Sequence, residues 1–158
     1  MDNKFDFISA TDKPALLAFS TPEWLETART ALVELGYKVH TAATHSDFLI
    51  RFSQIRYQVV MVEELFAANN AAENQTLSAL QQMPMSQRRH ATVLLLGDSF
   101  QTFTPMQAFQ QSVHAVINSS EIFLLKQLIE KAVADNALFL HSYHESQARA
   151  YASAAKDA

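Results

Sequence analysis

The 158-residue sequence contains no cysteine and only two glycines, Gly36 and Gly97. Without cysteine the chain can form neither a disulfide nor a cysteine-ligated metal site, and this absence fits a reducing cytoplasm. Because the chain has only two glycines, it lacks the glycine-rich loops that usually hold a bound phosphate group in an α/β fold. These absences favour a protein without a dedicated nucleotide-binding loop.

Excess charge and long apolar runs are also missing. The 12 basic and 16 acidic side chains leave a formal charge of −4, which gives no reason to expect direct contact with nucleic acid. No apolar run approaches the ~20 residues of a membrane span. The first residues hold no apolar stretch long enough for a signal peptide. We therefore expect a cytoplasmic protein without a membrane span.

What the sequence does contain is a regular alternation of apolar segments and helical patterns. Apolar residues make up 49% of the chain, which indicates a globular protein. Five short segments are mostly continuous apolar runs, as expected for strands covered on both faces. They are Ala15–Phe19, Lys38–Ala42, Gln58–Val62, Thr92–Leu96 and Ala115–Ile117.

Helix start signals stand between these segments. Serine, threonine or aspartate begins four of the helical patterns, and prolines occupy first-turn positions in two of them. These starts are Ser20–Glu23, Ser46–Asp47, Thr104–Pro105 and Ser119–Glu121. Leu77 and Leu80 mark a further helix after the polar segment 69–75, which we interpret as a loop. Strands that alternate with helices of this length predict an α/β fold. The expected architecture is a five-stranded parallel, flavodoxin-like sheet with helices on both faces.

The stretch ALLAFSTPEWLETARTALVELGYKVHTAATHSDFL, with its GYKV step into the second strand, resembles the first half of a bacterial response-regulator receiver (CheY-like) domain. The resemblance runs from about Pro14 to Asp135. It implies a bacterial signalling protein, organised as an N-terminal extension (1–13), a receiver-like domain (14–135) and a helical extension (136–158).

The residues that a receiver uses for phosphorylation are not kept. The resemblance implies that a magnesium-binding acidic pair, an acceptor aspartate, a hydroxyl residue and a lysine should follow the strands. The aligned positions hold Phe19, Ser20, Glu63, Gly97 and Ser119. Magnesium prefers oxygen ligands, often carboxylates, and phosphoryl transfer depends on positioning and charge neutralisation. We therefore expect a non-catalytic pseudo-receiver that needs no cofactor.

Two interpretations of Glu63 remain open. Its carboxylate either imitates a phosphorylated aspartate or is simply a solvated or hydrogen-bonded acid. A further alternative is a flavodoxin-like domain that binds a small ligand or nucleotide at the carboxyl edge of the sheet. The residues available for such a site are Ser20, Thr21, Glu63, Glu64, Asp98 and Ser119.

A metal site is not expected. His141 and His144 are spaced to share one side of a helix, but no third ligand is evident in the sequence. Two exposed helix histidines explain this pattern without a metal.

The C-terminal part exceeds what a receiver needs. No proline or glycine follows Pro105, so a helix can run from Glu121 to about Ser153. Its seam positions, most of them apolar, step by three and four as in a heptad pattern: Ile122, Leu125, Ile129, Ala132, Asn136, Phe139, Tyr143, Ser146 and Ala150. A polar residue within such a seam often fixes register, so we expect Asn136 to do so.

The exposed end of this helix is the expected interaction site. A domain that ends near Asp135 cannot cover Leu138, Phe139, Leu140 and Tyr143, and burial of each would be worth about 1.5–3 kcal/mol. The predicted partner is another protein, a second copy of the chain, or both. The alternative is that the segment folds back onto its own domain.

Overall fold

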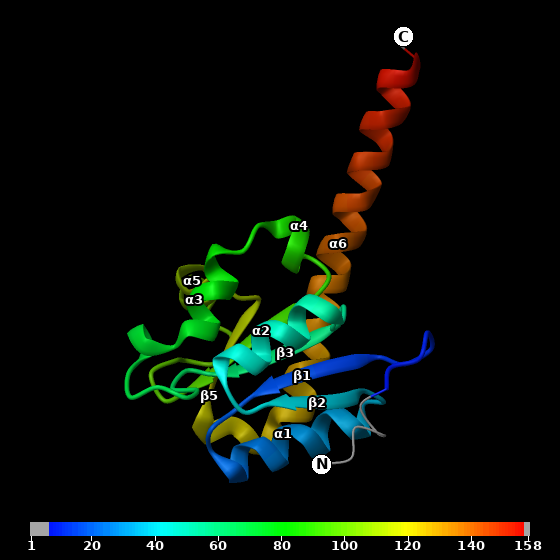
Figure 1. Cartoon of the computed structure of the whole chain (residues 1–158). Helices are drawn as coiled ribbons and strands as arrows, with labels where there is room; N and C mark the ends of the chain where they lie inside the picture. The colour runs from blue at the N-terminus through cyan, green and yellow to red at the C-terminus, as the bar shows by residue number, and fades with distance from the viewer. Residues whose placement is uncertain (1–6, 157–158) are drawn as a thin grey trace.

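The computed structural model describes residues 7–156, which form one α/β body and a long C-terminal helix (Figure 1). Along the chain the elements are β1 (Pro14–Ala18), α1 (Pro22–Glu34), β2 (Lys38–Ala42), α2 (His45–Gln54), β3 (Val59–Glu63), η2 (Ala71–Glu73), α3 (Gln75–Gln82), α4 (Met85–Arg88), β4 (Thr92–Gly97), α5 (Pro105–Gln111), β5 (Ala115–Asn118), η3 (Ser119–Leu124) and α6 (Leu125–Lys156). The labels η2 and η3 denote 3₁₀-helices.

The five strands form one parallel sheet in the order β2-β1-β3-β4-β5. This is the flavodoxin-like order, and it confirms the predicted fold. The prediction of β2 matches the observed strand, and the other four strands differ from the predicted bounds by one residue at one end or both. The continuous apolar runs arise because both faces of these strands are covered.

Two apolar layers enclose the sheet. On one face, Phe48, Phe52, Leu77 and Leu80 from α2 and α3 pack on Val60 and neighbouring strand residues. On the other face, α1 and the first turns of α6 cover the sheet with Ala28, Ala31, Leu32, Leu125, Ile129 and Ala132. Both layers are visible in Figure 1, where α1 lies on the opposite side of the strands from α2.

The helix starts follow the predicted chemistry with one shift. Pro22 and Pro105 begin α1 and α5. The cap of α2 is Thr44, whose hydroxyl accepts a hydrogen bond from the Asp47 backbone N–H at 3.0 Å. The helix therefore starts at His45, one residue before the predicted Ser46.

The parallel sheet gives the body two distinct edges. Glu63, Gly97 and Asn118 end their strands at the carboxyl edge, and Thr92 begins β4 at the amino edge. The chain leaves the carboxyl edge through η3, and α6 then runs back past the amino edge and out of the body (Figure 1). None of the helices within residues 7–156 combines the length and apolarity needed to cross a membrane.

Candidate functional site

Glu63 is the last residue of β3, and its carboxylate turns toward the start of α1. Oε2 accepts hydrogen bonds from the backbone N–H groups of Ser20 at 2.6 Å and Thr21 at 3.0 Å. Oε1 accepts a third from the Thr21 hydroxyl at 2.6 Å. Only 5% of the residue is exposed. The carboxylate is therefore an internal ligand of the β1–α1 loop.

The local sequence explains why this loop accepts a carboxylate. Thr21 is the N-cap of α1, yet its own side chain makes no capping hydrogen bond. The first N–H groups of a helix lack partners within the helix, and their dipoles favour an anion. Glu63 supplies an anion at this helix start from the neighbouring strand, and it binds the two N–H groups that directly precede α1.

Hydrogen bonds also connect the loops after β1 and β3. The Ser20 hydroxyl oxygen accepts the backbone N–H of Ala67 at 2.7 Å, and Ala67 has a positive φ of 48°. Asn74 is fully buried and donates from Nδ2 to the carbonyls of Glu63 and Glu64, each at 3.0 Å. These contacts hold the carboxyl edge of β3 in one arrangement.

Sequence reasoning missed Asn74. It assigned residues 69–75 to a polar loop, but Asn74 caps α3 by accepting the Leu77 N–H at 3.1 Å. An asparagine three residues before the first apolar residue of a helix is a recognisable cap signal. Its second role at the end of β3 depends on tertiary packing, which the sequence alone does not reveal.

Glu64 points away from Glu63 and lies against Gly97. The Ser99 hydroxyl donates to the Glu64 carboxylate at 2.6 Å. A Cβ added at Gly97 would lie 2.8 Å from both the Cβ and Oε1 of Glu64. Real Cβ atoms do not approach this closely, so the last position of β4 requires glycine because Glu64 occupies the space.

The remaining residues of the carboxyl edge form a separate cluster. The Ser119 hydroxyl donates to Oδ1 of Asp98. Asn118 donates from Nδ2 to the carbonyl of Phe100 at 2.7 Å, and its Oδ1 accepts the Ser120 N–H at 2.8 Å. The structure therefore divides the predicted edge residues into two groups, one around Glu63 and one around Asp98.

Phe19 and the predicted histidine pair behave as structural residues. Phe19 is 5% exposed and belongs to the apolar layer under α1, so nothing polar replaces the first position of a receiver's acidic pair. His141 Nε2 lies 3.9 Å from Glu145, an exposed pair one helical turn apart. Within residues 7–156, no group of three or more histidine, aspartate or glutamate side chains is placed to hold a metal ion.

Known proteins match this chain among the solved structures. No protein-family model matches the chain, and no curated protein matches it. Among solved structures, a CheY-like receiver domain protein from Methanospirillum hungatei matches with a TM-score of 0.62 and 13% identity, covering 80% of this chain and 98% of that one. The orphan response regulator HP1043 of H. pylori matches with a TM-score of 0.58 and 18% identity, covering 76% and 95%.

The chain has the receiver fold. A third match is a fusion protein carrying the trimeric coiled-coil segment of yeast Spc42, with a TM-score of 0.63 and 20% identity over 87% of this chain and 86% of that one. At these identities the matches establish the fold and not the chemistry of the site. That chemistry has to be argued from the residues of this chain.

Within the receiver fold, α6 corresponds to the last helix of the domain and continues far beyond it. Its 32 residues span about 48 Å at 1.5 Å per residue. We call Ala137–Ala155 the rod. Residues 141–155 are all exposed, and Figure 1 shows the rod standing clear of the body. The alternative in which this segment folds back onto its own domain does not describe this structure.

We expected Asn136 to fix the register of a seam between chains, and this expectation is wrong. It is 7% exposed and donates from Nδ2 to the Thr92 hydroxyl at 2.9 Å. The preceding seam residues Leu125, Ile129 and Ala132 are likewise buried in the body. The expectation failed because the same helical stripe serves the domain core first, and the sequence does not mark where the core ends.

The base of the rod keeps one further contact with the body. The Arg89 guanidinium lies 4.8 Å from the centre of the Tyr143 ring and donates to its hydroxyl at 3.3 Å. Beside this contact is a groove of about 160 Å³, lined by Met85, Arg89, His114, Asn136, Phe139, Leu140 and Tyr143. Leu140 and Tyr143 therefore touch the body, although Tyr143 remains 37% exposed.

Leu138 and Phe139 are the exposed members of the predicted contact set. Each is 68% exposed. Successive helix residues are 100° apart, so Phe139 follows the stripe of Asn136 and Tyr143 whereas Leu138 lies on the opposite side. Only Phe139, Leu140 and Tyr143 thus share one face of the rod.

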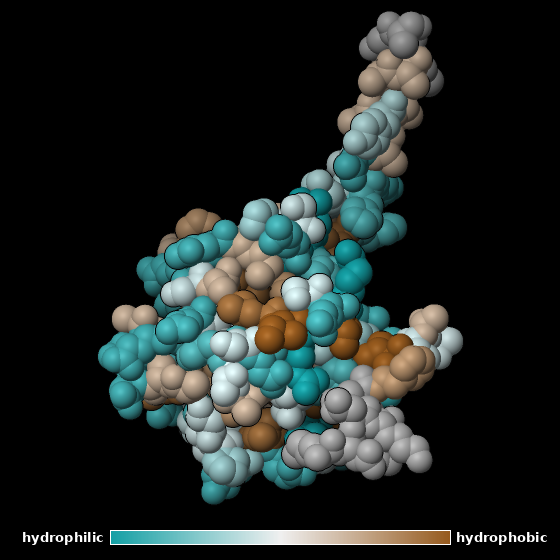
Figure 2. Space-filling view, in the orientation of Figure 1, coloured by the Kyte–Doolittle hydropathy of each residue, from teal (hydrophilic) through white to brown (hydrophobic). Residues whose placement is uncertain are grey.

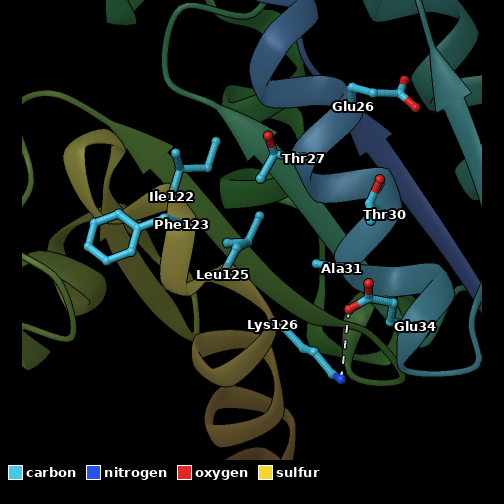
Figure 3. Close-up of a pocket in the computed structure, with 9 residues that line it drawn as sticks. All are labelled: Glu26, Thr27, Thr30, Ala31, Glu34, Ile122, Phe123, Leu125 and Lys126. Atoms are coloured by element: carbon cyan, nitrogen blue, oxygen red, sulfur yellow. Dashed lines mark ion pairs between the residues drawn. The ribbon is translucent and has the colours of Figure 1, made fainter.

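A larger groove lies between α1 and η3 (Figure 3). It has a volume of about 340 Å³, and an ion pair of 3.8 Å joins Lys126 and Glu34 at one end. Its lining is Glu26, Thr27, Thr30, Ala31, Glu34, Ile122, Phe123, Leu125 and Lys126. The groove runs along the flank of the body, and its lining includes neither Glu63 nor Asp98.

Proposed function

We propose that this chain is a non-catalytic pseudo-receiver that acts as a protein–protein interaction module in bacterial signalling, regulation or assembly. The observation that carries this proposal is the hydrogen-bonded carboxylate of Glu63 at the head of α1. In an active receiver this crevice must admit a metal ion and a phosphoryl donor. Here the chain's own glutamate uses the donors of the β1–α1 loop.

The neighbouring residues support the absence of phosphoryl transfer. The acidic pair is replaced by a core phenylalanine and by Ser20, whose hydroxyl accepts the Ala67 N–H. The hydroxyl of Ser119, where a receiver would place lysine, donates to Asp98 and not to Glu63. None of these three positions therefore supplies a metal ligand or a cation to neutralise charge on a transferred phosphoryl group, which is the main requirement of that reaction.

The same contacts weigh against the alternative of a ligand-binding site at this edge. A phosphate-bearing ligand at the α1 N-terminus would need the N–H groups of Ser20 and Thr21, and Glu63 already accepts both. Thermal denaturation with and without nucleotides or divalent cations tests this point, since a ligand of the folded state raises its melting temperature.

The interaction function rests on the rod. Phe139 and Tyr143 lie on one face of the rod, and they remain 68% and 37% exposed although Tyr143 contacts Arg89 of the body. Full burial of an apolar side chain is worth about 1.5–3 kcal/mol. A rod whose apolar face is buried by a partner is therefore more stable than one whose face is exposed to water. We propose that a protein partner, a second copy, or both cover this face.

Two experiments test the proposal. Incubation of the protein with acetyl phosphate and magnesium should leave its intact mass unchanged, and a stable phosphoryl adduct would contradict the non-catalytic assignment. The double substitution Phe139→Ser with Tyr143→Ser should weaken association, measured by light scattering and by binding to purified candidate partners. The double substitution His141→Ser with Glu145→Ser, on the other face of the rod, is the matched control.

The interaction assignment fails if neither the solution mass nor partner binding responds to the Phe139 and Tyr143 substitutions. A cytoplasmic location and a bacterial origin stay predictions from the sequence.

A further inference from the structure

The uncovered face of the rod continues the face that α6 buries in the body. Ile129 and Asn136 are buried, and Phe139, Tyr143, Ala150 and Ala154 follow at helical steps of three, four and seven residues. The body stops covering this stripe just after Asn136. The stripe itself continues for another 28 Å or so, at 1.5 Å per residue.

The opposite face of the rod is suited to water. Arg149 and Glu145 form an ion pair of 3.2 Å there, and His141 lies 3.9 Å from the same carboxylate. In Figure 2 the rod shows polar residues (teal) among weakly hydrophobic ones (tan). Because the charged side chains of the rod are turned away from the stripe, two rods can bring their stripes together without burying a charged residue of either rod.

Side-chain size changes along the stripe. Near the body it carries Phe139, Leu140 and Tyr143, and toward the tip it carries Ser146, Ala150 and Ala154. If two rods packed in parallel, bulky residues would meet bulky ones and the tips would have only small side chains to bury. In an antiparallel pair each bulky residue meets a small one, and such alternation lets helices pack closely.

In one register of the antiparallel rods, the bulky residues of each stripe face small residues of the other. With the two-fold axis between Ser146 and Gln147, Phe139 faces Ala154 of the second copy and Tyr143 faces its Ala150. Tyr151, which is 69% exposed, lies on the same flank of the rod as Leu140. In this register Tyr151 of one copy reaches Leu140 of the other, beside the 160 Å³ groove at the base of the rod.

We propose that the partner of the rod is a second copy of this chain, packed antiparallel so that the tip of each rod docks at the base of the other. This inference rests on the proposed interaction function and names its partner. It gives a two-fold dimer in which the two bodies lie at opposite ends of a paired rod. Each carboxyl edge faces away from the paired rods, because α6 leaves from the amino edge.

The area available is consistent with a reversible dimer. Phe139, Tyr143 and Tyr151 expose 68%, 37% and 69% of their surface. At about 200 Å² per aromatic side chain, two copies offer roughly 700 Å² from these residues alone. The small residues between them raise the total to about 1,000 Å², where specific interfaces begin. We therefore expect dissociation on dilution.

Matched arginine substitutions test which face is covered. Ala150→Arg places a charge on the stripe, and Ala152→Arg places the same charge on the opposite face. At high protein concentration the wild-type protein and Ala152→Arg should approach twice the 17.7 kDa mass of one chain, whereas Ala150→Arg should remain a monomer. Circular dichroism of both variants checks that the fold is intact. A monomeric wild-type protein, or an unaffected Ala150→Arg, would overturn the inference.

Spin labels test the direction of packing. The chain has no cysteine, so Ala154→Cys gives a single labelling site. Antiparallel rods separate the two labels by 15 residues along the axis, and the expected distance is about 25 Å. Labels at Ser146→Cys should lie about 10 Å apart.

The outcomes separate this inference from the proposed function. A distance of about 10 Å at position 154 would mean parallel rods: the antiparallel inference would be wrong while the rod remained an interface. A purely monomeric protein whose partner binding still responds to Phe139→Ser with Tyr143→Ser would reject the second copy and keep the interaction function.

Discussion

Thr21 holds both oxygens of the Glu63 carboxylate: its backbone N–H donates to Oε2 at 3.0 Å and its hydroxyl donates to Oε1 at 2.6 Å. A residue of the β1–α1 loop is thus bound to the end of β3 by two hydrogen bonds to a nearly buried acid. Hydrogen bonds to charged groups are stronger than those between neutral groups. The crevice of this receiver fold is organised around that contact.

We expect Glu63→Gln to destabilise the protein by about 1–3 kcal/mol, since an amide offers only one acceptor oxygen to the three donors. Urea denaturation followed by circular dichroism measures the change. Glu64→Gln is the matched control, because that carboxylate is half-buried and accepts only from the Ser99 hydroxyl. Equal losses for the two substitutions would contradict the role assigned to Glu63.

Gly97→Ala should also destabilise the protein, by about 1–3 kcal/mol, because the added methyl group would lie 2.8 Å from Glu64 Cβ. The loss should shrink in a Glu64→Gly background, where the close atoms are gone. A double-mutant cycle of unfolding free energies measures this coupling. Additive effects would show that Gly97 is not constrained by Glu64.

Arg88 joins two helix ends from inside the body. It is 4% exposed and donates to the carbonyl of Leu80 and to that of Ser112, each at 2.6 Å. Burial lowers the pKa of Arg88. We expect Arg88→Met to cost about 2–4 kcal/mol, because two carbonyls lose charge-assisted hydrogen bonds.

The matched control is Arg89→Met, at the exposed neighbouring residue. This substitution should lower the free energy of unfolding by less than about 1 kcal/mol. Chemical denaturation of the two variants under the same conditions makes the comparison. A small effect at Arg88 would mean that α3 and α5 do not depend on this side chain.

The sequence predicted the sheet well because its signals are local. Mostly continuous apolar runs located the five strands, and prolines located the starts of α1 and α5. The resemblance to receivers also singled out Glu63 as an unusual residue at the end of β3. The direction of its carboxylate depends on the approach of Thr21 from the loop after β1, which no local pattern encodes.

The C-terminal helix shows what the sequence could not predict. Its periodicity is uniform, so the sequence located the helix but not the point where it leaves the body. Asn136 was expected between chains because a polar residue interrupts an apolar seam. It lies against Thr92 instead, because α6 still packs against the first residue of β4 at this point.

The last prediction concerns His114, which precedes β5 at the amino edge. Burial and the nearby Arg88 lower the pKa of His114 to about 4, and its unprotonated Nδ1 accepts the Val93 N–H at 2.9 Å. The folded state thus favours the neutral imidazole, whereas the unfolded chain titrates near 6.5. Stability from this group is fully present above pH 6.5 and is lost as the pH falls toward 4.

The full effect of this shift is on the order of 3 kcal/mol. Urea denaturation of the wild-type protein at pH values from 7.5 to 4.5 should show the decline, and His114→Asn should flatten most of it. A residual slope is expected from His90, whose pKa is also lowered by burial and by Arg56. His141→Asn on the exposed rod should leave the wild-type slope unchanged. If His114→Asn and the wild-type protein lose stability in parallel, protonation of His114 does not govern the acid sensitivity of this edge.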